Sequence, residues 1–214
     1  EVAEDCSRIW DNAFKFTEQL QTLTLPRPLT YIGNNTFVGC KALKNIYAYT
    51  RSVPQTEENA FEGIEKSKIT VHVYASAHDS YKESWGEEFK YVMMPDPQTI
   101  TLTINVAETG TLASLIEEAA AEKSSTIYDV TGITVTGNIN HDDLRTLANM
   151  CTGVYSLTTV NLGGVTIENN YIDGYWFSDR EKLTTIVLPE TLEYIDQYAF
   201  YNCKSLLTVD VAEG

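Results

Sequence analysis

Residues 20–37 read LQTLTLPRPLTYIGNNTF, and this stretch decides the fold. Its apolar residues form the phrase Leu20-x-x-Leu23-x-Leu25-Pro26-x-x-Leu29-x-x-Ile32-Gly33. In Leu-x-x-Leu-x-Leu the last three residues alternate between two faces, as they do in a half-buried strand. We therefore expect a short strand at residues 23–25, with both leucines facing a core.

The same phrase returns along the chain at a spacing of about 23 residues, which indicates a repeat architecture. The N-terminal copies are anchored by Phe14, Leu20 and Leu23, then by Phe37, Leu43 and Ile46, and more loosely by Ala60 and Phe61. The C-terminal copies are anchored by Leu157, Val160 and Leu162, by Leu183, Ile186 and Leu188, and by Leu206, Val209 and Val211. Because so short a unit cannot enclose a core, neighbouring units must stack and pair their strands in parallel. The pattern predicts a solenoid, with Phe14, Phe37 and Phe61, and Phe177 and Phe200, forming two columns of rings.

The repeats stop between the two arrays, where other elements are expected. Residues 69–74 alternate as a strand, and residues 89–93 form a last short apolar piece. Between them Ser76 is the expected helix N-cap with Asp79 completing a capping box, Tyr81 and Trp85 share one helix face, and Gly86 stops the helix. This segment predicts a cap over the open end of the first stack.

A stiff junction, residues 94–97, follows the first array. Residues 100–106 then alternate as a strand, Thr111 begins a helix, residues 133–135 form a further strand, and Asn140 caps a second helix that ends before Gly153. We read this segment as the opening cap of a second stack. The predicted domains are therefore 1–94, an array with its ending cap, and 98–214, an opening cap with the first repeats of a second array.

These repeats resemble those of the BspA-like bacterial leucine-rich repeat proteins. The resemblance rests on the phrase Leu-Pro-x-x-Leu-x-x-Ile-Gly-x-x-Ala-Phe-x-x-Cys, which appears from Leu25 to Cys40 and from Leu188 to Cys203. It implies a leucine-rich repeat solenoid in a secreted or cell-surface bacterial protein that binds host or matrix macromolecules and has no enzymatic role. Three positions depart from the pattern: Trp10 and Asp196 replace glycine, and Thr56 replaces an inward isoleucine.

Charge and hydropathy exclude several functions. The 214 residues include 15 Lys and Arg against 30 Asp and Glu, a net charge of −15. A chain this acidic is not expected to bind nucleic acid, which requires a cationic surface, or to dock on anionic lipid. No apolar run approaches the roughly 20 residues of a membrane span, so no membrane insertion is expected in this segment.

Residues that could carry chemistry are few and scattered. The histidines, 72, 78 and 141, make no metal-ligand motif, and the cysteines, 6, 40, 151 and 203, include no CxxC pair and read as small core residues. The carboxylates show no pairing in sequence, and no glycine-rich phosphate loop is present. We therefore predict no catalytic residues, no metal and no cofactor.

The outward residues of the strands remain as the candidate binding surface. They are Thr22, Thr24, Asn45 and Tyr47 in the first stack and Thr159, Asn161, Thr185, Val187, Thr208 and Asp210 in the second. Solenoids bind through such extended faces, although threonine ladders also suit any exposed strand. The expected function is a non-catalytic adhesion or binding module for a host or matrix protein or glycan. The alternatives are a structural spacer without a ligand or a carbohydrate-active enzyme.

The two outer ends hold the same repeat position, since Val2 and Val211 both align with Leu25. Neither end carries a cap pattern of its own. This symmetry predicts that the last repeat of one molecule stacks head to tail on the first repeat of another.

Overall fold

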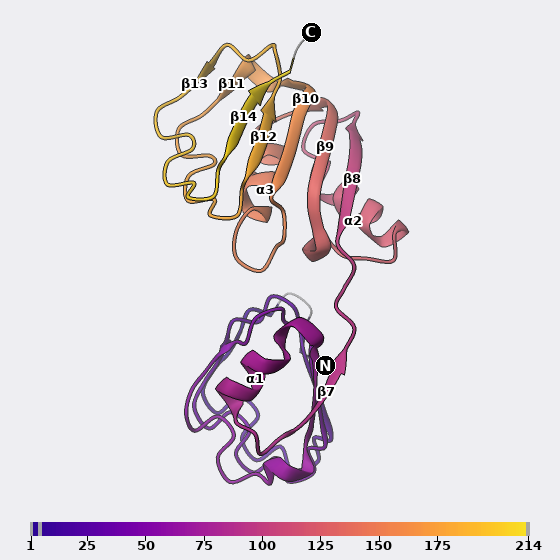
Figure 1. Cartoon of the computed structure of the whole chain (residues 1–214), viewed down its shortest axis with the longest axis vertical. Coiled ribbons are helices and arrows are strands. Elements are labelled where there is room, and N and C mark those ends of the chain that lie inside the picture. The colour runs from indigo at the N-terminus through magenta and orange to yellow at the C-terminus, as the bar shows by residue number, and fades with distance from the viewer. Residues whose placement is uncertain (1, 4–5, 213–214) are drawn as a thin grey trace. The chain divides into compact units, whose positions relative to one another are not determined.

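The chain is described here from a computed structural model, which covers residues 2–3 and 6–212 (Figure 1). It divides into two compact units, residues 1–96 and 97–214. Each unit has its own hydrophobic core and its own set of parallel strands.

The first unit contains two parallel sheets and one helix. Its strands are β1 (Arg8–Ile9), β2 (Thr22–Leu25), β3 (Tyr31–Ile32), β4 (Asn45–Ala48), β5 (Gln55–Thr56), β6 (Thr70–Tyr74) and β7 (Lys90–Met94). The 3-10 turns η1 (Lys66–Lys68) and η2 (Ala75–Ala77) and the helix α1 (His78–Trp85) complete it. The sheets have the strand orders β1-β3-β5 and β2-β4-β6-β7. Leu23 pairs with Ile46 across β2 and β4, so each residue of a strand lies beside the equivalent residue of the next repeat.

The core of the first unit contains the expected column of rings. Phe37 lies 5.8 Å from Phe14 and 5.2 Å from Phe61 between ring centroids, both pairs nearly parallel at 6° and 17°. Trp85 and Phe89 then meet Phe61 at 4.8 and 5.3 Å, tilted by 58° and 75°. The cap thus ends the column by turning its rings across the stacking direction, a favourable aromatic geometry.

Helix α1 closes the stack as expected, but it begins differently. Tyr81 and Trp85 are both buried on its inner face, and Gly86 at φ 96° ends it. The prediction that Ser76 is the N-cap was wrong, because the helix begins at His78 after the turn η2 and Ala77 precedes it without a side-chain cap. The hydroxyl of Ser76 instead donates to Asp96 Oδ1 at 2.6 Å, and its backbone N–H donates to the same oxygen.

Thr56, one of the departures from the repeat pattern, has a structural explanation. The indole N–H of Trp85 donates to Thr56 Oγ1 at 3.0 Å, and the threonine hydroxyl donates to the carbonyl of Pro54. An isoleucine at position 56 would leave the half-buried indole N–H without this acceptor.

The second unit begins with a strand–helix cap and continues into repeats. Its strands are β8 (Ile100–Val106), β9 (Val130–Ile139), β10 (Thr159–Ile167), β11 (Tyr171–Ile172), β12 (Thr185–Leu188), β13 (Tyr194–Ile195) and β14 (Thr208–Val211). The helices are α2 (Leu112–Glu122) and α3 (His141–Met150), with 3-10 turns η3 (Ile127–Asp129) and η4 (Glu168–Asn170). One parallel sheet has the order β14-β12-β10-β9-β8, and β11 pairs with β13. Buried residues of α2 and α3 share one core with the inward residues of the five-stranded sheet.

A buried carboxylate joins the starts of the two helices. Asn140 caps α3 as expected, accepting from the N–H groups of Asp142 and Asp143 in a full capping box. Asp143, 1% exposed, then accepts from the backbone N–H groups of Gly110, Leu112 and Asn140 at 2.8, 3.0 and 3.0 Å. A single side chain therefore satisfies donors that the N-terminus of α2 and its own helix would leave unpaired.

The last repeat of the second unit is open to solvent. Phe177 stacks on Phe200 at 5.3 Å and 14°, so this ring column is confirmed as well. Val209 and Val211 lie on β14, the edge strand of the described sheet, and are 48% and 61% exposed. Cys203 is half-buried, which corrects the expectation of a buried core cysteine, and Cys6 in the first repeat is half-buried too. Head-to-tail stacking of one molecule on another stays a prediction. Sedimentation velocity at increasing protein concentration would measure the association.

In each repeat that contributes a phenylalanine to a ring column, the residue two positions after that phenylalanine has a positive φ, in the left-handed region. These residues are Phe16, Gly39, Gly63, Asp179 and Asn202. Gly39 has a second constraint, because a Cβ there would lie 2.5 Å from the ring of Phe16 in the preceding repeat. A side chain at position 39 would therefore require the Phe16 ring to move.

Candidate functional site

The outward residues of the first unit form ladders across neighbouring strands. Thr22 pairs with Asn45 and Thr24 with Tyr47, as the repeat spacing predicts. Their sequence neighbours Leu23 and Ile46 are buried, which fixes the ladder residues on the opposite face of the sheet. In β6 the ladders continue to Thr70 and His72.

Tyr47 and His72 form a fixed pair on this face. Their rings are parallel within 8°, with centroids 4.2 Å apart. His72 Nε2 also lies 3.3 Å from Asn45 Oδ1, so a proton on that nitrogen is donated to the amide oxygen. All three side chains are half-buried in the strand face. We name this set, Asn45, Tyr47 and His72, the strand-face cluster.

The sequence pattern missed His72 as a partner of Tyr47. His72 comes later in the chain than the repeat spacing predicts for that place in the ladder, because the third repeat is longer than the first two. The alternation of residues 69–74 identified it correctly as an outward residue. Aligning that strand with β4 by its inward residues, Val71 on Ile46, would have located the pair.

The six candidates of the second unit lie on a separate strand face. Thr159, Thr185 and Thr208 form one ladder, and Asn161, Val187 and Asp210 form the next. Strands β9 and β8 extend the second ladder with Thr134 and Thr103. The amide oxygen of Asn161 accepts from the N–H of Gly163 at 2.9 Å, so it is engaged within its own strand. This face is rich in threonine and has no aromatic ring among the six candidates.

The cysteine thiols belong to the structural framework. Cys40 donates to the carbonyl of Phe14 and Cys203 to that of Phe177, so each thiol bonds to the column phenylalanine of the preceding repeat. Cys151 donates to Leu147 within α3, and burial raises the pKa of its thiol to about 12. A thiol with so high a pKa holds almost no thiolate at neutral pH.

The histidines make no catalytic arrangement with the cysteines. His141 packs edge-on against Tyr171 and Trp176, with ring centroids 5.4 and 4.3 Å away. His78 contacts Asp79 and the ring of Tyr91. Within residues 2–3 and 6–212, no three His, Cys, Asp or Glu side chains are grouped closely enough to hold a metal ion.

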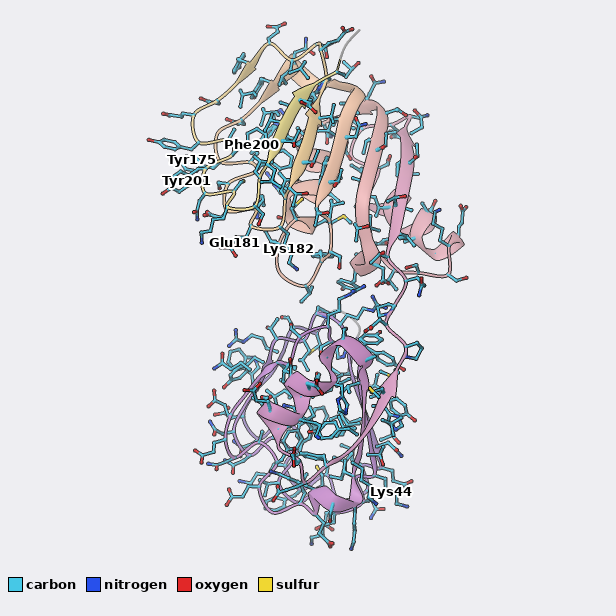
Figure 2. The ribbon with its side chains drawn as sticks, in the orientation of Figure 1. Lys44, Tyr175, Glu181, Lys182, Phe200 and Tyr201 are labelled. Atoms are coloured by element: carbon cyan, nitrogen blue, oxygen red, sulfur yellow. The ribbon has the colours of Figure 1, made fainter. Side chains whose placement is uncertain are left out.

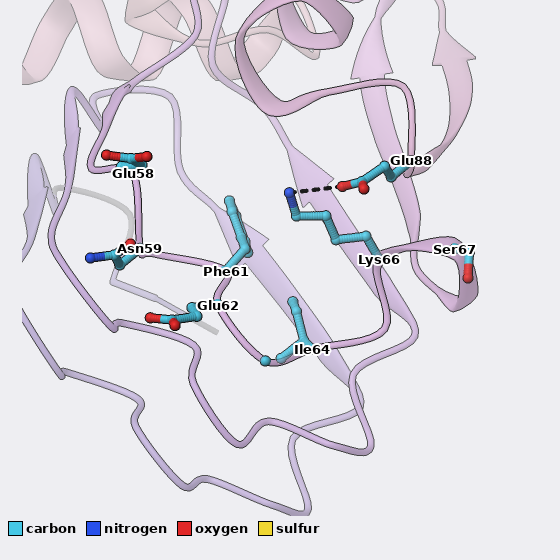
Figure 3. A pocket seen from close by; sticks show the side chains of 9 residues that line it. Glu58, Asn59, Phe61, Glu62, Ile64, Lys66, Ser67 and Glu88 are labelled. Atoms are coloured by element: carbon cyan, nitrogen blue, oxygen red, sulfur yellow. Dashed lines mark ion pairs between the residues drawn. The ribbon is translucent and has the colours of Figure 1, made fainter.

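A shallow hollow of about 610 Å³ lies beside the cap of the first unit (Figure 3). Its lining includes Glu58, Glu62, Lys66 and Glu88. Lys66 Nζ pairs with Glu88 at 3.0 Å and lies 5.6 Å from the centre of the Phe89 ring. The hollow is open and its lysine is already engaged, so the strand-face cluster remains the better-ordered candidate site.

Comparison with known proteins identifies the family. A family model described as the BspA type leucine rich repeat region matches residues 7–97 and 142–214 in six copies. The chain belongs to this family, as the repeats indicated, and its fold is the leucine-rich repeat solenoid with parallel strands.

One solved structure similar to the chain is a leucine rich cell surface protein from Faecalibacterium prausnitzii A2-165. The sequence identity is 15% and the TM-score is 0.27. The match covers 97% of this chain and 64% of the other, so the chain spans less than two thirds of that protein. No curated protein matches. Among the described residues, no helix has the length and apolar character needed to cross a membrane.

Proposed function

We propose that the chain is a non-catalytic binding module of a secreted or cell-surface bacterial protein, used for adhesion to a host or matrix protein. The observation that carries the proposal is the strand-face cluster. Its rings are stacked and its imidazole is hydrogen-bonded before any partner arrives. Such preorganisation lowers the entropy lost on binding.

The geometry of the cluster favours a protein partner over a glycan. One face of the Tyr47 ring is covered by His72, and Thr24 is its neighbour in register on the other side. A sugar ring stacks on an open aromatic face, whereas one face of this tyrosine is already occupied by an imidazole. Tyrosine in that setting is a frequent hot-spot residue of protein interfaces.

The threonine-rich face of the second unit extends the same proposal. Its ladders offer hydroxyl groups at the regular spacing of parallel strands. Without an aromatic anchor among the six candidates, this face is expected to bind a partner more weakly than the strand-face cluster does.

Binding of the whole chain to an array of matrix proteins and glycans tests the proposal. Tyr47→Ala is expected to weaken binding to the captured protein by roughly 30-fold, a hot-spot effect. Thr24→Ala, its neighbour in the ladder, is the matched control and should change affinity little. Capture of glycans alone, or equal binding by the Tyr47 variant, would contradict the proposal, and a chain that captures nothing would be a spacer.

A further inference from the structure

Two tyrosines of the second unit occupy a backbone position that does not suit them. Tyr175 and Tyr198 have φ of 65° and 61°, in the left-handed region. The same repeat position in the first unit holds Asn12 and Asn35, at φ 60° and 53°. Asparagine is enriched in this conformation, whereas a bulky residue there is an outlier. Since strained residues of this kind gather at functional sites, we asked what the two rings could do.

The two tyrosines and Tyr201 form an exposed aromatic patch. Tyr175 and Tyr198 stack at 5.1 Å and 20°, and Tyr201 meets Tyr198 edge-on at 5.8 Å and 85°. Each of the three is more than half exposed. Figure 2 shows Tyr175 and Tyr201 at the outer edge of the turns, on the side away from strands β12 and β14. We name these three residues the tyrosine patch. It is separate from the strand faces.

The first unit shows which chemical group its exposed rings attract. The guanidinium of Arg8 lies 4.7 Å from the ring centre of Trp10 and 4.6 Å from that of Tyr31. Lys15 Nζ lies 5.6 Å from the ring centre of Phe16. The exposed rings of Trp10 and Phe16 and the half-buried ring of Tyr31 therefore carry cations from their own chain.

The tyrosine patch has no such cation. Within the described part of the chain, no Lys or Arg lies over the ring of Tyr175, Tyr198 or Tyr201. Because a cation near an aromatic face is attracted by the ring quadrupole, these rings offer a position that a partner's cation can fill.

The charge around the patch also selects a cation. The same two turns contain Asp173, Asp179 and Asp196, and Asp179 accepts from the neutral amide of Asn202 at 2.6 Å. The cations of these turns are engaged, because Arg180 donates to the carbonyl of Trp176 and Lys204 pairs with Glu181. Residues 97–214 contain 5 Lys and Arg against 16 Asp and Glu, a net charge of −11. Residues 1–96 contain 10 against 14, a net charge of −4. The patch thus lies in the more acidic unit, whose field attracts cationic partners.

We propose that the tyrosine patch is a second binding surface, which takes an arginine- or lysine-bearing segment of a partner protein. The cationic side chain lies over the rings of Tyr175 and Tyr198, and the net negative charge of the second unit attracts it. The strain at these two positions is tolerated because asparagine, the better local choice, cannot provide a ring.

A decaarginine peptide, titrated by fluorescence anisotropy at low ionic strength, tests this proposal. The double variant Tyr175→Asn with Tyr198→Asn keeps the net charge and uses the residue that the first unit has at this position, so it is expected to fold. Its affinity for the peptide should fall about tenfold relative to the unchanged chain, the combined effect of two exposed cation–π contacts. Tyr175→Phe with Tyr198→Phe keeps both rings and should retain the affinity.

Two results would overturn the proposal. Equal affinity of the asparagine variant and the unchanged chain would assign the binding to net charge alone. Binding of the neutral sugar cellohexaose that depends on the two tyrosines, without loss of peptide affinity in the asparagine variant, would make the patch a glycan site. Tyr47→Ala should leave peptide affinity unchanged, which separates this surface from the strand-face cluster.

Discussion

The two units are built from the same kind of repeat, but their caps lie at opposite ends. The cap follows the repeats in the first unit and precedes them in the second. In the first unit the ring column runs through Phe37 to Phe61, and the tilted ring of Trp85 and the edge-on ring of Phe89 close it. In the second unit the column is short, and the buried residues of α2 and α3 belong to the same core as Phe177. The difference indicates that a stack of repeats needs an apolar surface packed against its first or its last repeat, and that the chemical nature of this surface can vary. Crossed rings and aliphatic helices both provide one.

The largest effect expected from this comparison is at the centre of the longer column. Phe37→Ala removes a fully buried ring with neighbours on both sides and should lower the free energy of unfolding by ~3–5 kcal/mol. Phe200→Ala, at the open end of the shorter column, should cost only about 1–2 kcal/mol because its ring is half-buried. Urea unfolding followed by circular dichroism measures both. Equal losses would show that the two columns are closed to the same degree.

The second expected effect is in the opening cap of the second unit. Asp143→Ala leaves three backbone N–H groups without their acceptor and should cost about 2–3 kcal/mol. Asp142→Ala is the matched control, since its exposed contact with Arg145 is worth little. Urea unfolding read at Trp176 should show the loss in the second unit. A similar loss in both variants would argue against the buried carboxylate as the link between α2 and α3.

The smallest expected effect is an exchange of turn residues between the units. Asn12→Tyr places a bulky residue at a left-handed position and should lower the free energy of unfolding by about 1 kcal/mol. Tyr198→Asn is the reverse exchange. It relieves the backbone strain but removes the ring stacking with Tyr175, and the two effects should roughly cancel. The free energy of unfolding should therefore change by no more than ~0.5 kcal/mol. Thermal unfolding measures the two melting temperatures. A large loss in the Tyr198 variant would mean that the tyrosine serves the fold rather than a ligand.

Periodicity was sufficient to predict the fold and the ladder positions between repeats of equal length. The repeat spacing predicted that Leu23 pairs with Ile46 and that Thr185 pairs with Thr208, because each coil contributes one strand at a fixed position. It failed for His72, because the repeat that contains it is longer. The cap of α3 was also predictable, since a capping box is a local pattern whose donors lie within one turn of the acceptor.

Contacts between distant residues could not be predicted in this way. Ser76 fits a local capping pattern, but Asp96, much later in the chain, takes its hydroxyl group instead. Asp143 resembles any acidic residue at a helix start, and nothing nearby in sequence reveals that Gly110 and Leu112 donate to it. The tyrosine patch was detectable in part, because Tyr175 and Tyr198 are one repeat apart in the sequence, but their left-handed backbone was not.

The ring of Phe16 against Gly39 limits how such an array can grow by duplication of its coding segment. A duplicated unit that carries glycine at the turn fits behind the first coil without steric conflict. A duplicate of the first coil placed behind itself would set a Cβ only 2.5 Å from the preceding phenylalanine ring. Lengthening of the array is therefore directional, and its coils are not freely interchangeable by recombination even where they have equal length.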